Sequence, residues 1–228
     1  YQISFSPNGQ QIAYSTDEGI WLVGIDGEEA PTLLLENSTP VPRYSHPCFA
    51  PRLNALLVQI DTGEELTQHA LDLNTGELLP GAAATDGFWL QDGRIGLYNQ
   101  AAATQGITAD ITIVDVISQQ RPPELALSLP YPLAYGDVRE VNAGKLMIAV
   151  QREIPGAGIV SIVEAPIGGE SQRIGVPGFM TQPTLSPDGA AIAGLTYTGG
   201  ALLVYDLQNG VLYHLAQPLG ILSVKWSP

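Results

Sequence analysis

One short phrase returns along the chain and limits what it can fold into. Its clear copies are Phe5-Ser6-Pro7-Asn8-Gly9, Phe49-Ala50-Pro51, Leu185-Ser186-Pro187-Asp188-Gly189 and Trp226-Ser227-Pro228. Residues 89–93 and 140–144 are degenerate copies, each followed by an apolar run like the clear ones. The equivalent anchors are Pro7, Pro51, Gln91, Asn142, Pro187 and Pro228, and successive anchors are 44, 40, 51, 45 and 41 residues apart. A period of about 40 to 50 residues is that of a four-stranded β-propeller blade.

The first repeat reads as four short strands joined by tight turns. Apolar runs at residues 3–6, 11–15, 20–25 and 32–35 are separated by turn residues, which predicts an antiparallel meander. In the first turn, Pro7 pre-sets its own φ and Gly9 tolerates a positive φ; Pro187 and Gly189 repeat this chemistry in the fifth repeat.

The other repeats follow the same order of elements. The second repeat is predicted to end in a strand at residues 77–79, and the third carries a long insertion at residues 99–109. The last strand of the fourth repeat is predicted to end at residue 174, and the first strand of the fifth to begin at residue 183. The predicted blades are residues 1–38, 44–80, 84–130, 134–176 and 180–217, followed by the first strand of another blade at 219–228. No stretch of 11 or more residues has a helical period, and no linker interrupts the repeats, so we predict a single all-β domain of four-stranded antiparallel blades, about five of them present. A β-sandwich is the less favoured alternative, because that fold does not require a phrase that returns at a fixed period.

A second marker recurs in every repeat, because an acidic residue closes the third strand. These residues are Asp26, Asp72, Asp115, Glu164 and Asp206. A carboxylate before a Gly or Asn turn accepts hydrogen bonds from the turn backbone, so we expect a structural role. A repeated catalytic carboxylate is the weaker alternative.

The charge of the chain restricts its partners. Nine Lys and Arg face 23 Asp and Glu, which gives a formal net charge of −14. Such a field repels phosphate backbones and anionic lipid surfaces, so we expect no nucleic acid as a partner. The simplest role of this acidity is to keep a β-rich protein soluble, and a basic partner or a cation site is the sharper alternative.

Few residues are available for chemistry. A single cysteine, Cys48, excludes an internal disulfide and a thiolate cluster for zinc, and no pair of the three histidines has metal-binding spacing. The chain has no GxSxG elbow, phosphate loop, dinucleotide fingerprint, HExxH helix or EF-hand loop. We therefore expect neither an enzyme nor a cofactor or metal site. No apolar run is long enough to insert into a membrane.

The repeats resemble the TolB-like (WD40-like) β-propeller repeat, with its "FSPDG" phrase, apolar strand and "DLDGG" turn. Residues 4–14, 20–27, 184–195 and 203–210 carry the resemblance; the third and fourth repeats lack the "SP" core. The resemblance implies a piece of a six- to eight-bladed ring and an extracytoplasmic location, in the periplasm or at the cell surface. Alternatively, the last strand replaces or supplements the first one in a closure seam.

Function is expected in surface loops, where aromatic and Arg side chains are typical interface anchors. The loops that lead into the first strand of a repeat contain Arg43, Tyr44, His46, Tyr131, Tyr135 and Phe179. We predict that these residues bind a protein or peptide partner; the alternative is that their rings cover neighbouring blades. Two further functions stay open, an accessory gating or docking propeller of a larger serine peptidase and a structural subunit of a cell-surface assembly.

Overall fold

The structure is a computed structural model that describes residues 3–99, 109–117, 121–129, 135–154, 157–196, 201–216 and 226. Every regular element in these ranges is a β-strand, which confirms the all-β prediction. Among the described residues no helix is long and apolar enough to cross a membrane.

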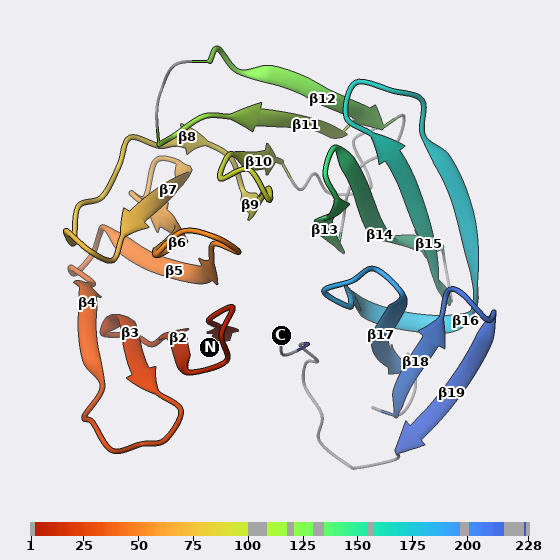
Figure 1. Cartoon of the computed structure of the whole chain (residues 1–228), viewed down its shortest axis with the longest axis horizontal. Coiled ribbons are helices and arrows are strands. Elements are labelled where there is room, and N and C mark those ends of the chain that lie inside the picture. The colour runs from red at the N-terminus through yellow and green to blue at the C-terminus, as the bar shows by residue number, and fades with distance from the viewer. Residues whose placement is uncertain are drawn as a thin grey trace. The chain divides into compact units, whose positions relative to one another are not determined.

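The first blade is the predicted meander. Its strands are β1 (Ile3–Phe5), β2 (Gln11–Ser15), β3 (Gly19–Gly24) and β4 (Thr32–Glu36), hydrogen-bonded in that order (Figure 1). All neighbouring strands are antiparallel, as the tight turns between them require.

The second blade differs from the prediction at its last strand. Its strands are β5 (Arg43–Phe49), β6 (Ala55–Asp61), β7 (Leu66–Asp72) and β8 (Ala82–Ala83). The predicted last strand at residues 77–79 is only an isolated bridge between Leu78 and Leu71, with backbone bonds from Leu79 N to Ala70 O at 2.8 Å and from Asp72 N to Glu77 O at 3.0 Å, and the last strand of the blade is β8. The imidazole Nδ1 of His69 lies 3.0 Å from the carbonyl oxygen of Leu79, so a side chain takes a position that a ladder bond would use.

The third blade has the strand order β9 (Asp86–Trp89), β10 (Ile95–Tyr98), β11 (Ala109–Val114) and β12 (Glu124–Leu129). Most of the insertion predicted at residues 99–109 lies outside the described residues.

The fourth and fifth blades share a seven-stranded sheet. Its strands are β13 (Tyr135–Asn142), β14 (Lys145–Ile154), β15 (Ala157–Pro166), β16 (Gln172–Leu185), β17 (Ala191–Thr196), β18 (Leu202–Asp206) and β19 (Val211–Ala216), in that order (Figure 1). The first part of β16, as far as Phe179, pairs with β15, and the part from Met180 onward pairs with β17. β16 is therefore the last strand of one blade and the first strand of the next, and the strands make five four-stranded antiparallel blades.

The chain divides into two compact units, and the boundary passes through the third blade. The first unit contains β1 to β10, and the second contains β13 to β19. The prediction of one domain with the stated blade boundaries stays a prediction.

In the first unit the core lies between successive blades. Ala13 and Ile20 of the first blade pack with Phe49, Leu56 and Val58 of the second. The opposite face of the second blade packs against the third through Leu57, Ala70, Trp89 and Leu97, among others. Residues 55–60 of β6 are all buried because blades cover both of its faces. Each such buried Leu stabilises the fold by roughly 1.5–3 kcal/mol.

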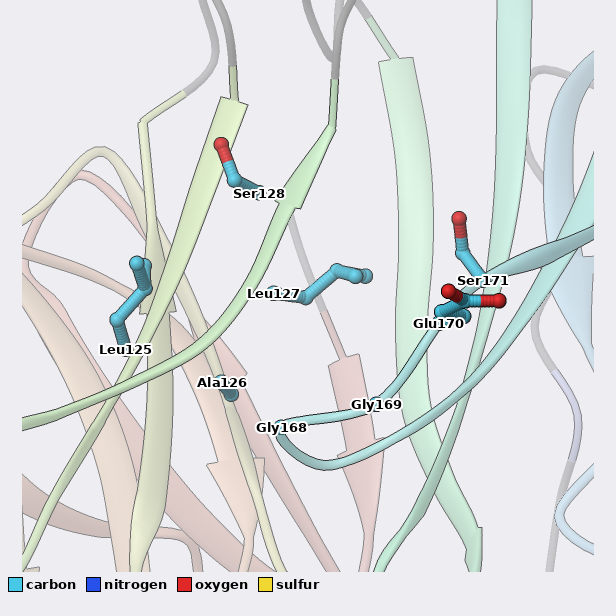
Figure 2. Close-up of a pocket in the computed structure, with 8 residues that line it drawn as sticks. All are labelled: Leu125, Ala126, Leu127, Ser128, Gly168, Gly169, Glu170 and Ser171. Carbon is cyan, nitrogen blue, oxygen red and sulfur yellow. The ribbon is translucent and has the colours of Figure 1, made fainter.

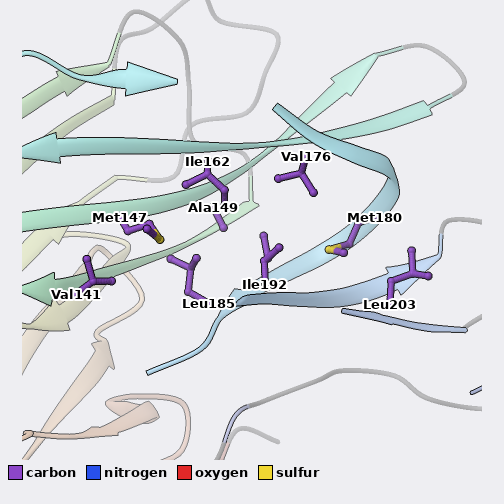
Figure 3. Close-up of a cluster of buried hydrophobic side chains, with 9 residues drawn as sticks. All are labelled: Val141, Met147, Ala149, Ile162, Val176, Met180, Leu185, Ile192 and Leu203. Atoms are coloured by element: carbon purple, nitrogen blue, oxygen red, sulfur yellow. The ribbon is translucent and has the colours of Figure 1, made fainter. Parts of the chain in front are cut away.

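The core of the second unit repeats this arrangement between the fourth and fifth blades (Figure 3). Met147, Ala149 and Ile162 face Leu185 and Ile192 across the interface. Gly194 in β17 has no room for a side chain, since an added Cβ would lie 2.2 Å from Cγ of Met180.

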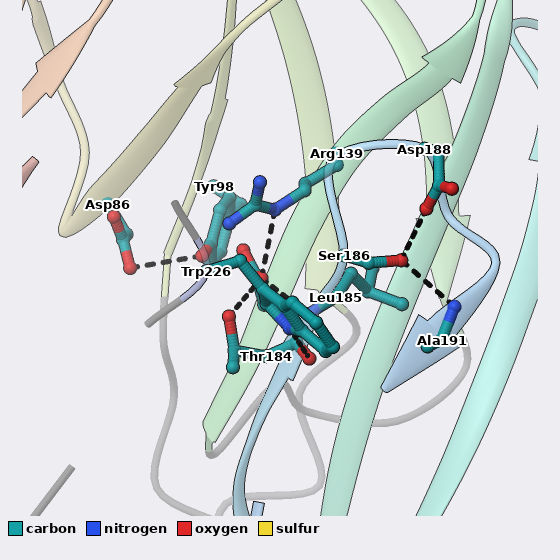
Figure 4. Close-up of polar contacts among 10 residues, drawn as sticks. Asp86, Tyr98, Arg139, Thr184, Leu185, Ser186, Asp188, Ala191 and Trp226 are labelled. Carbon is teal, nitrogen blue, oxygen red and sulfur yellow. Dashed lines mark hydrogen bonds and ion pairs between the residues drawn. The ribbon is translucent and has the colours of Figure 1, made fainter. Parts of the chain in front are cut away.

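The recurring phrase forms the same hydrogen-bonded turn in the first and fifth blades. The Ser186 hydroxyl donates to Oδ1 of Asp188 at 2.6 Å and accepts from the N–H of Ala191 at 2.9 Å (Figure 4). Ser6 makes the equivalent bonds to Asn8 at 2.7 Å and Gln11 at 2.9 Å. In both turns the closing glycine has a positive φ, 67° at Gly9 and 70° at Gly189, and donates its N–H to the serine carbonyl.

Hydrogen bonds also join the first strand of one blade to the next. The residue two positions before the anchor donates to the preceding repeat at four places. These bonds run from Phe49 N to Ser4 Oγ (3.1 Å), Trp89 Nε1 to Cys48 O (3.0 Å), Leu185 N to Asp137 Oδ2 (2.8 Å) and Trp226 Nε1 to Thr184 O (3.1 Å). The bond from Trp226 to Thr184 is visible in Figure 4.

Candidate functional site

Three of the sequence-predicted binding residues lie at one end of blade two, where β5 begins, β6 ends and β7 begins. Arg43 is exposed, and the register of the sheet pairs it with Asp61. Its Nε donates to the carbonyl oxygen of Pro40 at 3.3 Å.

Tyr44 and His46 are less accessible than Arg43. Tyr44 is half-buried and packs against the core between blades one and two, and its N–H donates to Oδ1 of Asn37 at 2.6 Å. His46 lies in a bulge of β5 with a φ of 56°, and its Nδ1 is 2.9 Å from the hydroxyl of Ser45. Tyr44 thus packs against a neighbouring blade, as the alternative to a binding role expects.

The other three predicted binding residues belong to the second unit or its boundary. Tyr131 lies outside the described residues. Tyr135 begins β13, and Phe179 lies in β16 opposite Ile159.

A pocket of about 480 Å³ opens at the same end of blade two. Its wall is formed by the loop between β6 and β7, by the segment from β8 to β9 and by the residue after β10, through Asp61, Gly63, Glu64, Glu65, Leu66, Ala83, Ala84, Thr85 and Asn99. The loop has a fixed backbone, because Oδ1 of Asp61 accepts from the N–H of Gly63 at 2.8 Å and Thr62 Oγ1 accepts from the N–H of Glu65 at 3.2 Å. The chain thus holds three carboxylates at one opening.

All the charged side chains that line this pocket are acidic. No Lys or Arg lines it, and no ion pair among the described residues includes Asp61, Glu64 or Glu65. Since Glu64 and Glu65 are exposed, their charges face solvent and attract a cationic group.

Polar side chains of β5, β6 and β7 are joined to the pocket wall through Thr85. Gln59 accepts from the hydroxyl of Ser45 at 3.2 Å and donates its Nε2 to the carbonyl oxygen of Thr85, which lines the pocket. Gln68, opposite Gln59 on β7, is buried, and its Nε2 has no partner among the described residues. A buried amide of this kind commonly binds an ordered water.

A second pocket, of about 530 Å³, lies in the second unit between β12 and the turn before β16 (Figure 2). Leu125, Leu127 and Ser128 come from β12, and Gly168, Gly169 and Glu170 from the turn. The N–H of Gly168 donates to the carbonyl oxygen of Ala126 at 2.9 Å, so the turn closes part of the β12 edge. No sequence-predicted binding residue lines this pocket.

Three of the five acidic residues that were predicted to close the third strands accept hydrogen bonds from turns. Oδ1 of Asp26 accepts from the N–H of Glu28, Oδ1 of Asp72 from that of Asn74, and Oδ1 of Asp206 from that of Gln208. Bonds from the side chain and backbone of Asn209 hold the pKa of Asp206 below its usual value of 3.8. Asp115 follows β11, and Glu164 in β15 pairs with Lys145 at 2.8 Å. Within the described ranges, no three His, Cys, Asp or Glu side chains gather as metal ligands would.

Sequence comparison gives no relative, since the chain matches no protein-family model and no curated protein. Its fold, in contrast, matches solved structures with a probability of 1.00. TolB from Acinetobacter baumannii is similar with a TM-score of 0.64 and 17% identity, over 94% of this chain and 52% of TolB.

Two structures from Pyrococcus species are similar over the same share of the chain. The β-propeller domain of the Trilobed protease from Pyrococcus furiosus has a TM-score of 0.60 and 14% identity, over 94% of this chain and 69% of that domain. Pyrococcus horikoshii acylaminoacyl peptidase has a TM-score of 0.59 and 12% identity, over 94% of this chain and 38% of the peptidase. The chain thus spans about half the length of TolB and less than half of the peptidase. Together with the five antiparallel blades, these similarities show that the chain has a β-propeller fold similar to that of TolB.

Proposed function

We propose that this chain is a non-enzymatic propeller that binds a cationic segment of a protein or peptide at the end of blade two. The blade-two site consists of Arg43, Asp61, Glu64, Glu65 and the pocket that the three carboxylates line. The observation that carries the proposal is this pocket, in which three carboxylates meet with no basic side chain among the lining residues.

The chemistry of the site favours a peptide over the other ligand classes. The net charge of −14 repels nucleic acid at long range, while an Arg or Lys side chain is drawn toward the pocket. Arg43, next to Asp61 in the sheet, can donate to a carboxylate or carbonyl group of the same partner. The sequence contains no GxSxG elbow and no HExxH helix, and this supports a proposal of binding without catalysis.

A direct test uses two fluorescent peptides of equal length, one rich in lysine and tyrosine and one rich in glutamate and tyrosine. Binding of each to the full-length protein is measured by fluorescence anisotropy at about 50 and about 300 mM NaCl, a range over which surface electrostatics are progressively screened. We expect the lysine peptide to bind more tightly and to weaken as the salt concentration rises.

A pair of charge reversals locates the site. In the double variant Glu64→Lys and Glu65→Lys the affinity for the lysine peptide should fall about tenfold or more, because each removed attraction is worth up to about 1 kcal/mol. The control is Glu28→Lys with Glu29→Lys, which changes the net charge equally in the exposed turn between β3 and β4. Equal losses in both double variants would show that only the overall charge matters and would refute the blade-two site.

The second candidate function is an accessory propeller of a larger serine peptidase. It is supported by the similarity to the propeller domain of the Trilobed protease and to acylaminoacyl peptidase. The complete open reading frame decides between the two, since a downstream hydrolase domain with a GxSxG elbow would favour the peptidase. We also propose an extracytoplasmic location, in the periplasm or at the cell surface, which is compatible with either function. A third alternative, a structural subunit of a cell-surface assembly, predicts that the protein binds neither test peptide.

A further inference from the structure

The segment between β4 and β5, residues 37–42, leads into the blade-two site and is closed by hydrogen bonds near its two ends. We call this segment the β4–β5 loop. Oδ1 of Asn37 accepts the N–H of Tyr44 at 2.6 Å, and the N–H of Ser38 donates to the carbonyl oxygen of Pro42 at 2.9 Å. Both bonds join the start of the loop to the chain that leaves it, so they fix the loop in one closed conformation.

The opposite end of the Asn37 amide holds the β4–β5 loop on blade one. Its Nδ2 donates to the carbonyl oxygens of Asp17 at 3.2 Å and Thr16 at 3.4 Å, both in the turn between β2 and β3. The backbone N–H of Asn37 donates to the carbonyl oxygen of Glu18 in the same turn at 2.8 Å. Asn37 therefore ties blade one to the start of β5 with both ends of its side chain.

These contacts also account for a sequence pattern. Residues 37–39, Asn-Ser-Thr, fit the acceptor pattern for N-glycosylation. A glycan would be attached to Nδ2 of Asn37, the atom that donates to the two turn carbonyls. The contacts of this nitrogen thus agree with a structural role for Asn37.

The β4–β5 loop lies beside the acidic pocket of the blade-two site. A Cβ added at Gly63, which lines the pocket, would be 3.5 Å from Cγ1 of Val41, so the Val41 side chain lies next to Gly63. Arg43 follows the loop and is paired in the sheet with Asp61, another residue of the pocket. The Nε of Arg43 donates back to the carbonyl oxygen of Pro40 at 3.3 Å. A movement of the loop would therefore move Arg43 relative to the carboxylates.

We propose that Asn37 is the positioning residue of the blade-two site, because it closes the β4–β5 loop and holds Arg43 beside the acidic pocket before a partner binds. Asn37 acts through Arg43 and does not itself touch the partner. The inference rests on the proposed function and makes it more specific: the partner segment carries a carboxylate next to its cationic residues, and Arg43 binds that carboxylate. An ordered loop loses less conformational entropy on binding, which strengthens this contact.

Amide hydrogen exchange of the full-length protein, followed by NMR, tests the closed loop without a ligand. In Asn37→Ala the N–H of Tyr44 loses its acceptor and should exchange at least about tenfold faster than in the wild type. Asn37→Asp keeps an oxygen acceptor and should restore the protection of Tyr44. The reference is the N–H of Ala50, which donates to the carbonyl oxygen of Ala55 beyond the other end of β5 and should exchange equally in all three proteins. Unchanged exchange of Tyr44 in Asn37→Ala, or the same acceleration in Asn37→Asp, would overturn the proposal.

A pair of peptides tests whether Asn37 positions Arg43 for binding. Both are lysine-rich and differ at one position, which is glutamate in one peptide and glutamine in the other. The measured quantity is the ratio of their two affinities, determined by fluorescence anisotropy. We expect this ratio to shift by about threefold toward the glutamine peptide in Asn37→Ala and in Arg43→Gln, because both variants weaken the contact with the glutamate.

The matched control is Asn54→Ala, which removes an asparagine at the opposite end of blade two, where Nδ2 donates to Oδ1 of Asn74 at 2.7 Å. This variant should keep the wild-type ratio. A wild-type ratio in Asn37→Ala would overturn the positioning role while leaving the proposed function intact. Failure of both peptides to bind the wild-type protein would refute the blade-two site itself and the positioning role with it, although the exchange of Tyr44 would still report the closed loop.

Discussion

At the scale of single residues, the recurring phrase is explained by one serine hydroxyl. Ser186 is buried and serves both as a donor to Asp188 and as an acceptor for the N–H of Ala191. Its Asp or Asn partner lies two residues later, and the glycine after that adopts a positive φ. The phrase therefore recurs because three adjacent conformational requirements must be met together at the same corner.

Ser186→Ala should destabilise the protein by about 1–2 kcal/mol, because the partly buried N–H of Ala191 loses its acceptor. Urea unfolding at neutral pH measures this change. The control is Ser171→Ala, which removes an exposed hydroxyl and should change the unfolding free energy by less than about 0.5 kcal/mol. Equal stability of the two variants would contradict the role of the serine.

The same turn predicts a contribution to acid sensitivity. The hydroxyl of Ser186 and the N–H of Ala190 hold the pKa of Asp188 below its usual value of 3.8. The ionised carboxylate therefore stabilises the fold above about pH 4, and this stabilisation is lost as the pH falls through the lowered folded-state pKa. In Asp188→Asn the unfolding free energy should fall less between about pH 5 and pH 2.5 than in the wild type. Parallel curves for the two proteins would rule out this contribution.

At the scale of strands, close approach decides which residues the blades tolerate. Gly96 in β10 lies against the ring of Phe88, and an added Cβ would be 2.2 Å from Cζ of that ring. Gly175 in β16 has no heavy atom within 4 Å of the same position. The two glycines are indistinguishable in the sequence, because only the packing of the neighbouring strand separates them.

Gly96→Ala should therefore cost at least about 1–3 kcal/mol through overpacking of the core. Gly175→Ala, on another strand, should be neutral within about 0.5 kcal/mol. Chemical denaturation of both variants provides the comparison, and a neutral Gly96→Ala would show that Phe88 can move away without cost.

Strand boundaries also separate what is predictable from what is not. The hairpins of blade one follow from local turn chemistry, since Pro7, Gly9 and Gly27 mark the turns directly. The last strand of blade two was predicted at residues 77–79 but lies at β8, where Ala82 and Ala83 pair with Gln68 and Thr67, because this pairing depends on cross-strand register rather than on local sequence. Likewise, β16 runs without interruption from blade four to blade five although residues 177 and 178 are a Pro and a Gly.

At the scale of the molecule, blade two has two apolar faces and packs them against two different neighbours, blade one and blade three. Residues of β6 alternate between the cluster with blade one and the cluster with blade three. The bonds from Trp89 to Cys48 and from Leu185 to Asp137 add directional contacts at the first strands.

The sequence by itself determined the repeat, the all-β class and the antiparallel blades, because turn residues and apolar alternation act within about 40 to 50 residues. It also identified Arg43 as a surface residue. Only the tertiary structure decided that Tyr44 packs into a core and that Thr85 and Asn99 of the next repeat complete an acidic pocket beside the loop between β6 and β7. The reason is that local turn chemistry specifies each hairpin, whereas a pocket depends on side chains that are distant in sequence and meet only when one blade packs against the next.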